Sequence, residues 1–390
     1  MGTRAHRSRL ADQVLPRVDL TDQPSQFRLG RRPALDGIRG LAVIAVVLAH
    51  FELASGFGEG GMVGVDVFFC LSGFLITTLL LEERSASGRI NLPAFYRRRA
   101  ARLLPGMLVF VATTIALVSI TGVDRSTTLP SVPVVLAYVE NWWAASGRSA
   151  GALGHMWSLS VEEQFYLVWP AVVILALRDR RATLAAVAAL GALVAVIDRE
   201  RACLNGAHCV YRVYLSTDTR MDQLLLGALL AIGCQAGLLD GVGRRAASLL
   251  GWPALVILTV FCCSATSWSS HFYDTTGMSI TALLSCTLIA SALASTDGAL
   301  LKLLSWRPLT AVGLVSYGIY LWNELFLVLI RDGTGIGQYP RAALIVVLTA
   351  TASALSWRFV ERPILRRARA GRGLRAAAES RDPVSETFAT

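Results

Sequence analysis

The chain is poor in charge: only 16% of its 390 residues are Asp, Glu, Lys or Arg, against roughly 25% in a typical soluble domain. Its hydrophobic content is 54%, and apolar runs long enough to cross a membrane recur between two polar ends. Backbone polar groups must be hydrogen-bonded within the segment inside hydrocarbon, which favours helices. The composition therefore excludes an ordinary soluble domain and predicts an all-α polytopic membrane protein.

Other features are missing as well. The 7 cysteines follow no metal-ligand spacing, so no metal site is expected. Two of them, Cys203 and Cys209, share a polar loop in which a disulfide stays open as an alternative. No apolar segment typical of a secretory signal occurs in residues 1–33, so none is expected. No repeat relates the two halves of the chain, which weighs against a transporter.

We expect about ten transmembrane helices. They are predicted at 35–52, 62–82, 104–121, 157–177, 182–198, 222–238, 249–265, 277–294, 309–331 and 341–358. The segments between them alternate in charge, since one set together with the two ends holds 28 Lys and Arg and the other set holds six. The positive-inside rule then places both termini in the cytoplasm. Because the basic residues are spread over many short loops, the net charge of +10 does not indicate a nucleic-acid partner.

Three regions follow from this pattern. We expect a basic cytoplasmic tail at 1–34, a membrane domain at 35–363 and a disordered cytoplasmic tail at 364–390. The last region is short and polar, so no soluble hydrolase-like domain is expected after the last helix. A further segment, Gly122 to Gly154, is predicted to lie on the outer interface, where its tryptophans would anchor it.

The first predicted helix carries two ionisable residues, Arg39 and His50. Eleven residues turn a helix through about 1100° and advance it by about 16 Å, so the two side chains share one face at different depths. Ionisable groups within a membrane usually face a cavity or a partner. The pattern predicts a polar site along this helix, with Arg39 near the cytoplasm and His50 in the outer half.

Several further polar residues are predicted at the depth of His50. They are Asp66, Glu162, Glu163, Arg220, Asp222 and Asn323. Each alone has a structural alternative: Asp66 and Asp222 are typical of helix starts, and Arg220 is able to pair with Asp218 or Asp222. Adjacent residues on a helix point about 100° apart, so only one of Glu162 and Glu163 would face His50. Taken together, these residues favour one polar cavity.

A basic segment, Phe95 to Pro105, precedes the third predicted helix. Its arginines allow two interpretations, an interfacial anchor on anionic lipid or a site for a phosphorylated cosubstrate, because Arg binds phosphate in a bidentate manner. The second interpretation fits the chemistry of His50, since a neutral imidazole is a general base for a hydroxyl and a carboxylate on its other nitrogen fixes the tautomer. An extended pantetheine arm is comparable in length to the gap between Arg39 and His50. The combination suits acyl transfer from cytoplasmic acyl-CoA to an acceptor at the outer half of the membrane.

An ordered set of motifs carries a family resemblance. They are Arg39 and His50 as R-x10-H, GGMVGVDVFFCLSGFLIT (Gly60 to Thr77), FYRRRAARLLP (Phe95 to Pro105), WSLSVEEQFYLVWP (Trp157 to Pro170), DTRMD (Asp218 to Asp222), SYGIYLW (Ser316 to Trp322) and ERP (Glu361 to Pro363). In these motifs the chain resembles the integral-membrane acyltransferase-3 family. The resemblance implies a ten-helix core, acyl-CoA as donor, essential roles for Arg39 and His50, and the FYRRR segment near the donor.

The chain departs from that pattern at one point. Relatives often have His after SYGIYLW, whereas Asn323 and Glu324 follow it here. An amide is no base, so a second imidazole role is in doubt at this position, while hydrogen bonding to an acceptor stays open.

The candidate site residues fall into three groups. The catalytic candidates are His50 with Glu163 or Asp66, the donor candidates are Arg39, Arg98, Arg102 and Tyr96, and the acceptor candidates are Arg220, Asp222, Glu162, Tyr317 and Asn323. We therefore expect an O-acyltransferase of the cell membrane. It would use acyl-CoA, by default acetyl-CoA, as a cosubstrate rather than as a tightly bound cofactor, and would modify a carbohydrate, cell-envelope glycan, lipid or metabolite hydroxyl. The alternative is a transporter or flippase that uses the same cavity as a passage.

Overall fold

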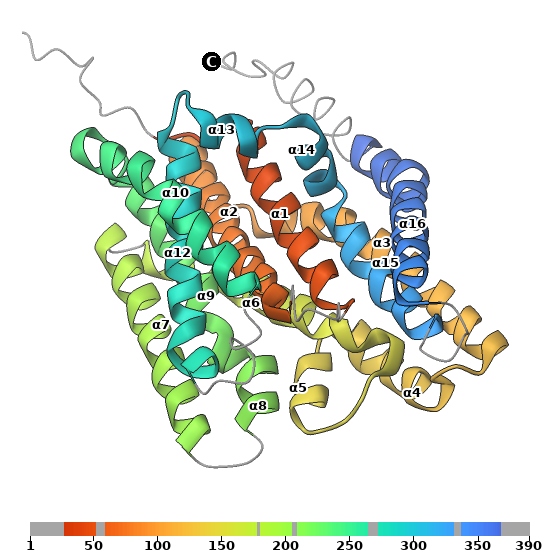
Figure 1. Cartoon of the computed structure of the whole chain (residues 1–390). Coiled ribbons are helices and arrows are strands. Elements are labelled where there is room, and N and C mark those ends of the chain that lie inside the picture. The colour runs from red at the N-terminus through yellow and green to blue at the C-terminus, as the bar shows by residue number, and fades with distance from the viewer. Residues whose placement is uncertain are drawn as a thin grey trace, which may run out of the picture.

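The structure is a computed structural model that describes residues 27–51, 59–177, 180–204, 209–263, 272–330 and 337–367. All regular elements in these residues are helices. Figure 1 shows them as a bundle with α1 near its middle, α2, α9 and α12 on one side of it, and α15, α3 and α16 on the other.

The elements follow one another in a simple order. The long helices are α1 (Pro33–Ala49), α2 (Val63–Ser87), α3 (Leu92–Thr121), α6 (Trp157–Ala176), α7 (Arg181–Leu204), α9 (Thr217–Gln235), α10 (Gly241–Cys263), α12 (Met278–Ala294), α15 (Ser316–Leu329) and α16 (Gln338–Ser356). Shorter helical elements join them: η1 (Glu59–Met62), α4 (Arg125–Leu136), α5 (Glu140–Ala145), η2 (Gly151–Met156), α8 (Cys209–Leu215), η3 (Tyr273–Gly277), α13 (Ala299–Leu304), α14 (Arg307–Leu314) and η4 (Trp357–Glu361).

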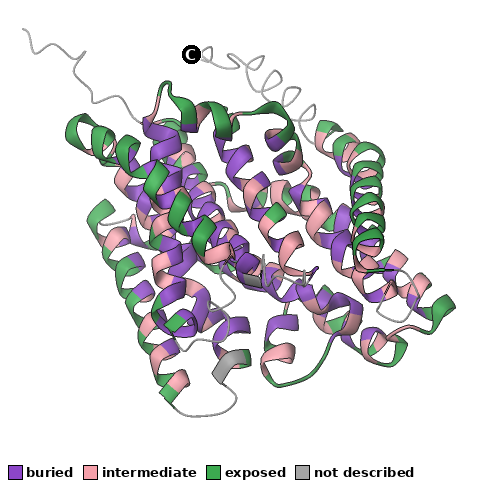
Figure 2. Cartoon of the chain, in the orientation of Figure 1, coloured by how far each residue is buried: buried purple, intermediate pink, exposed green. Residues whose placement is uncertain are grey.

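Each of the ten predicted segments overlaps a helix, and the described residues hold seven single helices long and apolar enough to cross a membrane. The bent pair of α14 and α15 would make eight. Two other helices fall short of that mark: α1 has 17 residues, and the 19 residues of α9 include Asp218, Arg220 and Asp222. Figure 2 shows exposed residues along the outer sides of α7, α10 and α16. Many of these are apolar, such as Leu249 at 76% exposure, which is what a lipid-facing surface requires.

Several predicted boundaries were wrong, and three of them bear on the site. The basic segment expected before the third helix forms its first turns instead, because α3 begins at Leu92. Asn91 caps this helix by accepting a hydrogen bond from the Ala94 backbone amide, and a proline follows in the first turn, which is typical of a helix start. The ninth predicted helix is broken at Val315, where α14 and α15 meet with a bend of 69°. The sixth begins at Thr217, so Arg220 and Asp222 lie within α9.

Glycine permits a close helix contact between α2 and α9. A Cβ atom added to Gly73 would lie 1.8 Å from the Leu224 carbonyl oxygen, and one added to Gly227 would lie 2.1 Å from the Cys70 carbonyl oxygen. Small residues let helix backbones approach in this way inside membranes. Since α2 and α9 also carry charged residues of the candidate site, this contact fixes the relative position of those side chains.

We predict that Gly73→Ala destabilises the protein by about 1–3 kcal/mol or more, because its Cβ must force the two backbones apart. Gly154→Ala is the matched control, since no atom lies within 4 Å of a Cβ at that position. Thermal unfolding of both purified variants in detergent tests this. Equal unfolding temperatures for the two variants would contradict the packing argument.

Candidate functional site

A cavity of about 190 Å³ lies between α1, α2, α3, α6 and α15. Its polar lining comprises Arg39, Ser72, Arg99, Arg102, Ser158, Glu162, Tyr166, Ser316, Tyr317 and Tyr320. The rest of its wall is apolar and comes mainly from α2. Five helices far apart in the sequence therefore contribute to one cavity with a mixed polar and apolar lining.

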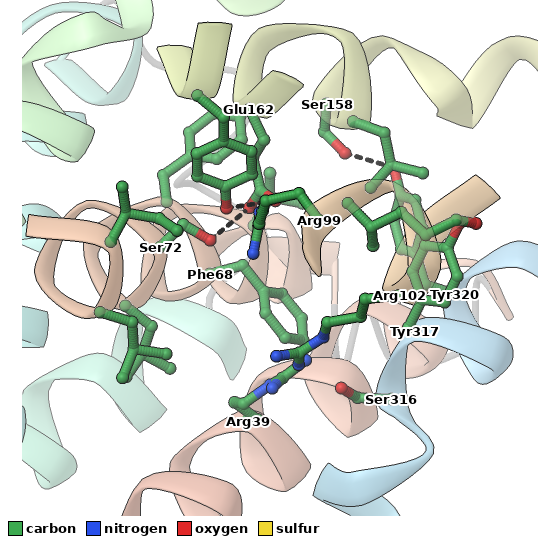
Figure 3. A pocket seen from close by; sticks show the side chains of 18 of the residues that line it. Arg39, Phe68, Ser72, Arg99, Arg102, Ser158, Glu162, Ser316, Tyr317 and Tyr320 are labelled. Atoms are coloured by element: carbon green, nitrogen blue, oxygen red, sulfur yellow. Dashed lines mark hydrogen bonds between the residues drawn. The ribbon is translucent and has the colours of Figure 1, made fainter. Parts of the chain in front are cut away.

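Three guanidinium groups face this cavity. Arg39 comes from α1, whereas Arg99 and Arg102 come from one face of α3, three residues apart. Figure 3 shows the ends of Arg39 and Arg102 close together, with Arg99 beside Glu162. No carboxylate among the described residues lies within 4 Å of Arg39 or Arg102. The cavity lining thus holds three guanidinium groups against one carboxylate, an excess of positive charge that suits an anionic ligand.

The single carboxylate that lines the cavity, Glu162, is held by hydrogen bonds. The Ser72 hydroxyl donates to it at 2.8 Å and the Tyr166 hydroxyl donates at 3.1 Å. The Arg99 guanidinium lies 3.7 Å from the centre of the Tyr166 ring, which adds a cation–π contact. The four side chains brace one another, so Glu162 has a fixed position at the cavity wall (Figure 3).

His50 lies just beyond the end of α1 and faces Glu324 of α15. The distance from His50 Nε2 to Glu324 Oε2 is 3.7 Å, and each side chain is about one quarter exposed, at 26% and 24%. His50 Nδ1 is buried and has no hydrogen-bond partner among the described residues. Glu324 follows the cavity residue Tyr320 by one helical turn, so the imidazole and its carboxylate lie near that part of the wall.

Tyr320 connects this part of the wall to α6. Its hydroxyl and the Ser158 hydroxyl are 2.6 Å apart, and it also donates to the His155 backbone carbonyl. The His155 ring packs edge-on against Tyr320 and Phe110, with ring centres 5.2 and 5.5 Å apart. Asn323, next to Glu324, is 2% exposed, and neither polar atom of its amide has a partner among the described residues.

The polar residues predicted at the depth of His50 do not lie together in the structure. Asp66 lies 2.6 Å from Arg220 and accepts a hydrogen bond of 2.6 Å from the Tyr273 hydroxyl. Asp222 receives two hydrogen bonds from Arg199, of 3.0 and 3.1 Å. All four charged side chains are fully buried between α2, α7, α9 and α12, and none lines the cavity. The expectation of one cavity shared by all these residues was wrong, as was the pairing of Arg220 with Asp218 or Asp222.

Two donor candidates also lie outside the cavity lining. Arg98 pairs with Glu83 at 2.9 Å, and the Tyr96 hydroxyl donates to the Leu167 backbone carbonyl. Adjacent residues of α3 point about 100° apart, which is why Arg99 lines the cavity and Arg98 does not. Arg99 and Arg102 are three residues apart and share a face of α3, and the signal for this was the cap at Asn91 that starts the helix at Leu92.

The acceptor candidate Tyr317 does line the cavity, and its hydroxyl donates to the Leu103 backbone carbonyl at 2.9 Å. Glu163 lies 3.8 Å from Arg99. The carboxylate that the structure places against His50 is thus Glu324, rather than Glu163 or Asp66. Its only sequence signal was its position beside Asn323, where the chain departs from the family motif. Cys209 and its possible disulfide lie outside the side chains that the structure describes.

One further carboxyl group is enclosed on the side of the bundle where α1 ends. Glu140 begins α5, outside the candidate spans, and is fully buried. Neither of its carboxylate oxygens has a hydrogen-bond partner among the described residues. Burial raises the pKa of Glu140 to about 8, so this group is a neutral acid in the folded protein at neutral pH.

Comparison with known proteins identifies the relatives of this chain. A family model described as "Acyltransferase domain" matches residues 32–360. The chain is 33% identical over 350 residues to the "Putative peptidoglycan O-acetyltransferase YrhL" of Bacillus subtilis strain 168, a match that covers 85% of this chain and 54% of that protein. It is 31% identical over 353 residues to the "O-acetyltransferase OatA" of Staphylococcus aureus strain NCTC 8325, covering 85% and 57%.

A third relative is the "Peptidoglycan O-acetyltransferase OatA" of Listeria monocytogenes, which is 33% identical over 350 residues, covering 85% of this chain and 55% of that protein. The chain spans just over half the length of these curated relatives. No solved structure matches the chain at a significant level.

The buried pair of Asp66 and Arg220 generates a stability prediction. Arg220→Met leaves the Asp66 carboxylate without its cation, and we expect a loss of about 3–5 kcal/mol. The double variant Asp66→Leu/Arg220→Met should recover much of that loss, because no charge stays unpaired. The free energy of unfolding in detergent is measured for the wild type, the single variant and the double variant. As a control, Arg212→Met removes a half-exposed pair with Asp218 and should cost at most about 1 kcal/mol. A double variant less stable than Arg220→Met would contradict this account.

Glu140 generates a prediction on pH. The folded protein retains the Glu140 proton up to about pH 8, whereas the unfolded chain releases it near its ordinary value of 4.5. The contribution of Glu140 to stability is therefore fully present below about pH 4.5 and is lost as pH rises through 8. Glu140→Gln stays neutral, so its unfolding temperature should exceed that of the wild type at pH 9 by several degrees. The difference should vanish at pH 4, and a difference independent of pH would refute the buried neutral acid.

Proposed function

Because the chain belongs to the acyltransferase family whose model matches residues 32–360, we propose that it is a membrane O-acetyltransferase. In this proposal it moves an acetyl group from cytoplasmic acetyl-CoA to a hydroxyl of peptidoglycan or another cell-envelope glycan. The names of the relatives, which include peptidoglycan O-acetyltransferases, support the acceptor class. The cavity with three converging guanidinium groups supports the donor and is the observation on which the proposal rests.

The proposal places the chain in the cell membrane with ten spans. The eight candidate spans are then completed by α1 and α9, whose charged residues are accommodated inside the bundle. Both termini and the start of α1 lie in the cytoplasm, as the charge of the loops favours. In this topology the segment around Ser146 faces the outside of the cell. A reporter enzyme that folds only outside the cytoplasm should therefore be active when it is fused after Ser146.

The phosphates of the donor bind to the three cavity arginines in this scheme. Arg39 and Arg102 have no carboxylate partner among the described residues, and a guanidinium group binds phosphate through two parallel hydrogen bonds. Glu162 accepts a hydrogen bond from Tyr166, and the Arg99 guanidinium lies on the Tyr166 ring. The cavity of about 190 Å³ is smaller than a whole CoA molecule, so it receives only part of the donor.

The reactive end of the donor reaches His50, about 16 Å along α1 from Arg39. In this scheme the Glu324 carboxylate, 3.7 Å from Nε2, attracts the Nε2 proton and thereby orients the imidazole, which leaves Nδ1 as the base. Nδ1 takes the proton of the acceptor hydroxyl while the hydroxyl oxygen attacks the thioester carbonyl carbon. The carbon–sulfur bond then breaks, and the departing thiolate receives the proton from His50. The products are the glycan ester and free CoA.

Glu324 takes the orienting role that the sequence assigned to Glu163 or Asp66. The acceptor hydroxyl would then approach from the side of Asn323, whose buried amide has unused hydrogen-bonding groups. Tyr320 and Ser158, linked to each other at the cavity wall, offer further hydroxyl groups to a glycan. We assign Asp66, Arg220 and Asp222 to holding α2, α7 and α9 together rather than to the substrates.

The function is tested by supplying labelled acetyl-CoA and soluble peptidoglycan fragments to proteoliposomes that contain the chain. Arg102→Gln should raise the KM for acetyl-CoA about tenfold or more, because it removes a charge-assisted contact with phosphate. Arg98→Gln is the matched control from the same arginine run and should change the KM by less than about twofold, since this arginine pairs with Glu83 outside the cavity. His50→Ala should reduce ester formation to background, and Glu324→Gln should lower kcat with little change in KM.

The opposite pattern of KM values would mean that acetyl-CoA binds outside this cavity. A large effect of Arg98→Gln combined with none of Arg102→Gln would refute the cavity as the donor site. Equal CoA release by wild type and His50→Ala with every glycan acceptor would refute the acyltransferase itself. Movement of an intact labelled solute across the liposome membrane without ester formation would then favour a transporter.

A further inference from the structure

A second cavity is lined by residues from the start of α1, α13 and neighbouring elements. Figure 1 shows α13 and the start of α1 at the same end of the bundle. The volume of this cavity, about 960 Å³, is roughly five times that of the first, and the two cavities share no lining residue. Its walls come from residues 27–34, the start of α7, the end of α9 with the turn that follows it, α10, the end of α12, and α13. Nothing in the proposed reaction uses this space.

Five arginines line the second cavity. They are Arg28, Arg31, Arg32, Arg181 and Arg244. One carboxylate, Asp240, accompanies them in the lining. None of the five guanidinium groups lies within 4 Å of a carboxylate among the described residues. Like charges gathered around a hollow raise the local potential and attract anions into it.

Several of these arginines are fixed in place by the backbone. Arg181 donates to the Gln235 carbonyl at 3.2 Å, Arg244 donates to the Ala294 carbonyl at 2.9 Å, and Arg32 donates to the Leu29 carbonyl at 3.1 Å. Each of these bonds uses one of the five N–H groups of a guanidinium. The remaining N–H groups are available to a ligand, and the arginines are already oriented for it.

The position of the cavity indicates from which side of the membrane a ligand would enter it. Its rim includes the segment that precedes α1 and the turns that follow α9 and α12. In the proposed topology these segments lie at the cytoplasmic surface. Basic pockets between helix ends at this surface bind phosphorylated headgroups, and Arg is the residue best suited to a phosphate oxygen pair.

We propose that this cavity binds a phosphate-bearing anion from the cytoplasmic side, through Arg181 and Arg244 on its wall and Arg28 and Arg31 on its rim. The ligand chemistry has two sources, the headgroup of an anionic phospholipid and a soluble phosphorylated molecule. The cytoplasmic side of this site rests on the topology in the proposed function, whereas the binding does not depend on the acyl transfer, because none of these four residues contributes to the first cavity.

The test uses the purified full chain in nanodiscs and two probes. In the first arm, nanodiscs of phosphatidylcholine alone are compared with nanodiscs that also contain cardiolipin. In the second arm, inorganic pyrophosphate is titrated into phosphatidylcholine nanodiscs. Thermal unfolding is followed in both arms, because a ligand that binds the folded state raises the unfolding temperature.

Arg181→Gln/Arg244→Gln should weaken the effective probe at least about tenfold. The matched control, Arg245→Gln/Lys302→Gln, removes the same charge from neighbouring positions that do not line the cavity and should respond like the wild type. Arg28→Gln/Arg31→Gln is a second variant, since neither side chain donates a hydrogen bond that the described fold needs. It keeps the test decisive if the first variant fails to fold.

A response to cardiolipin that both cavity variants lose identifies the source as lipid, and a response to pyrophosphate that they lose identifies a soluble phosphate. The effective probe should also weaken as salt rises, because exposed ionic contacts are screened. The proposal is overturned if neither probe stabilises the wild type, or if the cavity variants respond like the control variant.

Discussion

A charge inside a membrane bundle is costly unless an opposite charge meets it, and this constraint orders the structure. Asp66 with Arg220 and Asp222 with Arg199 are fully buried and paired. Their partners come from α2, α7 and α9, so meeting the constraint ties these helices together. Hydrogen bonds from Tyr273 and Ser279 occupy further acceptor positions of the two carboxylates. The result is a fixed half of the bundle whose paired charges line no part of the first cavity, although α2 supplies most of the apolar wall of that cavity.

The first cavity differs from this half of the bundle because its positive charges outnumber its negative charges. Arg39 and Arg102 face each other without a carboxylate within 4 Å among the described residues. Keeping two such groups together costs free energy that a bound anion would recover. The arginines of α7 and α9 are paired with carboxylates and stabilise the fold, whereas Arg39 and Arg102 are not paired and are suited to binding a ligand. Pairing therefore distinguishes these two roles better than depth in the membrane does.

The pair of His50 and Glu324 gives the departure from the family motif a physical meaning. At Asn323 the chain lacks the imidazole that relatives often carry, but the next residue supplies a carboxylate 3.7 Å from His50. In the proposed reaction this carboxylate stabilises the imidazolium, so one histidine suffices as base and acid. The bend of 69° between α14 and α15 sets the direction in which α15 runs toward the end of α1, and therefore whether the two groups meet.

The sequence by itself determined the helical class, because hydropathy and helical periodicity are local properties of the chain. The sidedness of the loops and the common face of Arg39 and His50 stay predictions from the same local properties. The sequence did not determine which charges meet. Arg98 and Arg99 are neighbours, and only the position of α3 in the bundle decides that Arg99 lines the cavity while Arg98 pairs with Glu83. Asp66 and Arg220 stand 154 residues apart in the chain, and His50 and Glu324 are farther apart still. Such pairs depend on how helices pack across the bundle. Side-chain volumes and the close approach at Gly73 and Gly227 determine this packing, and no local sequence pattern predicts it.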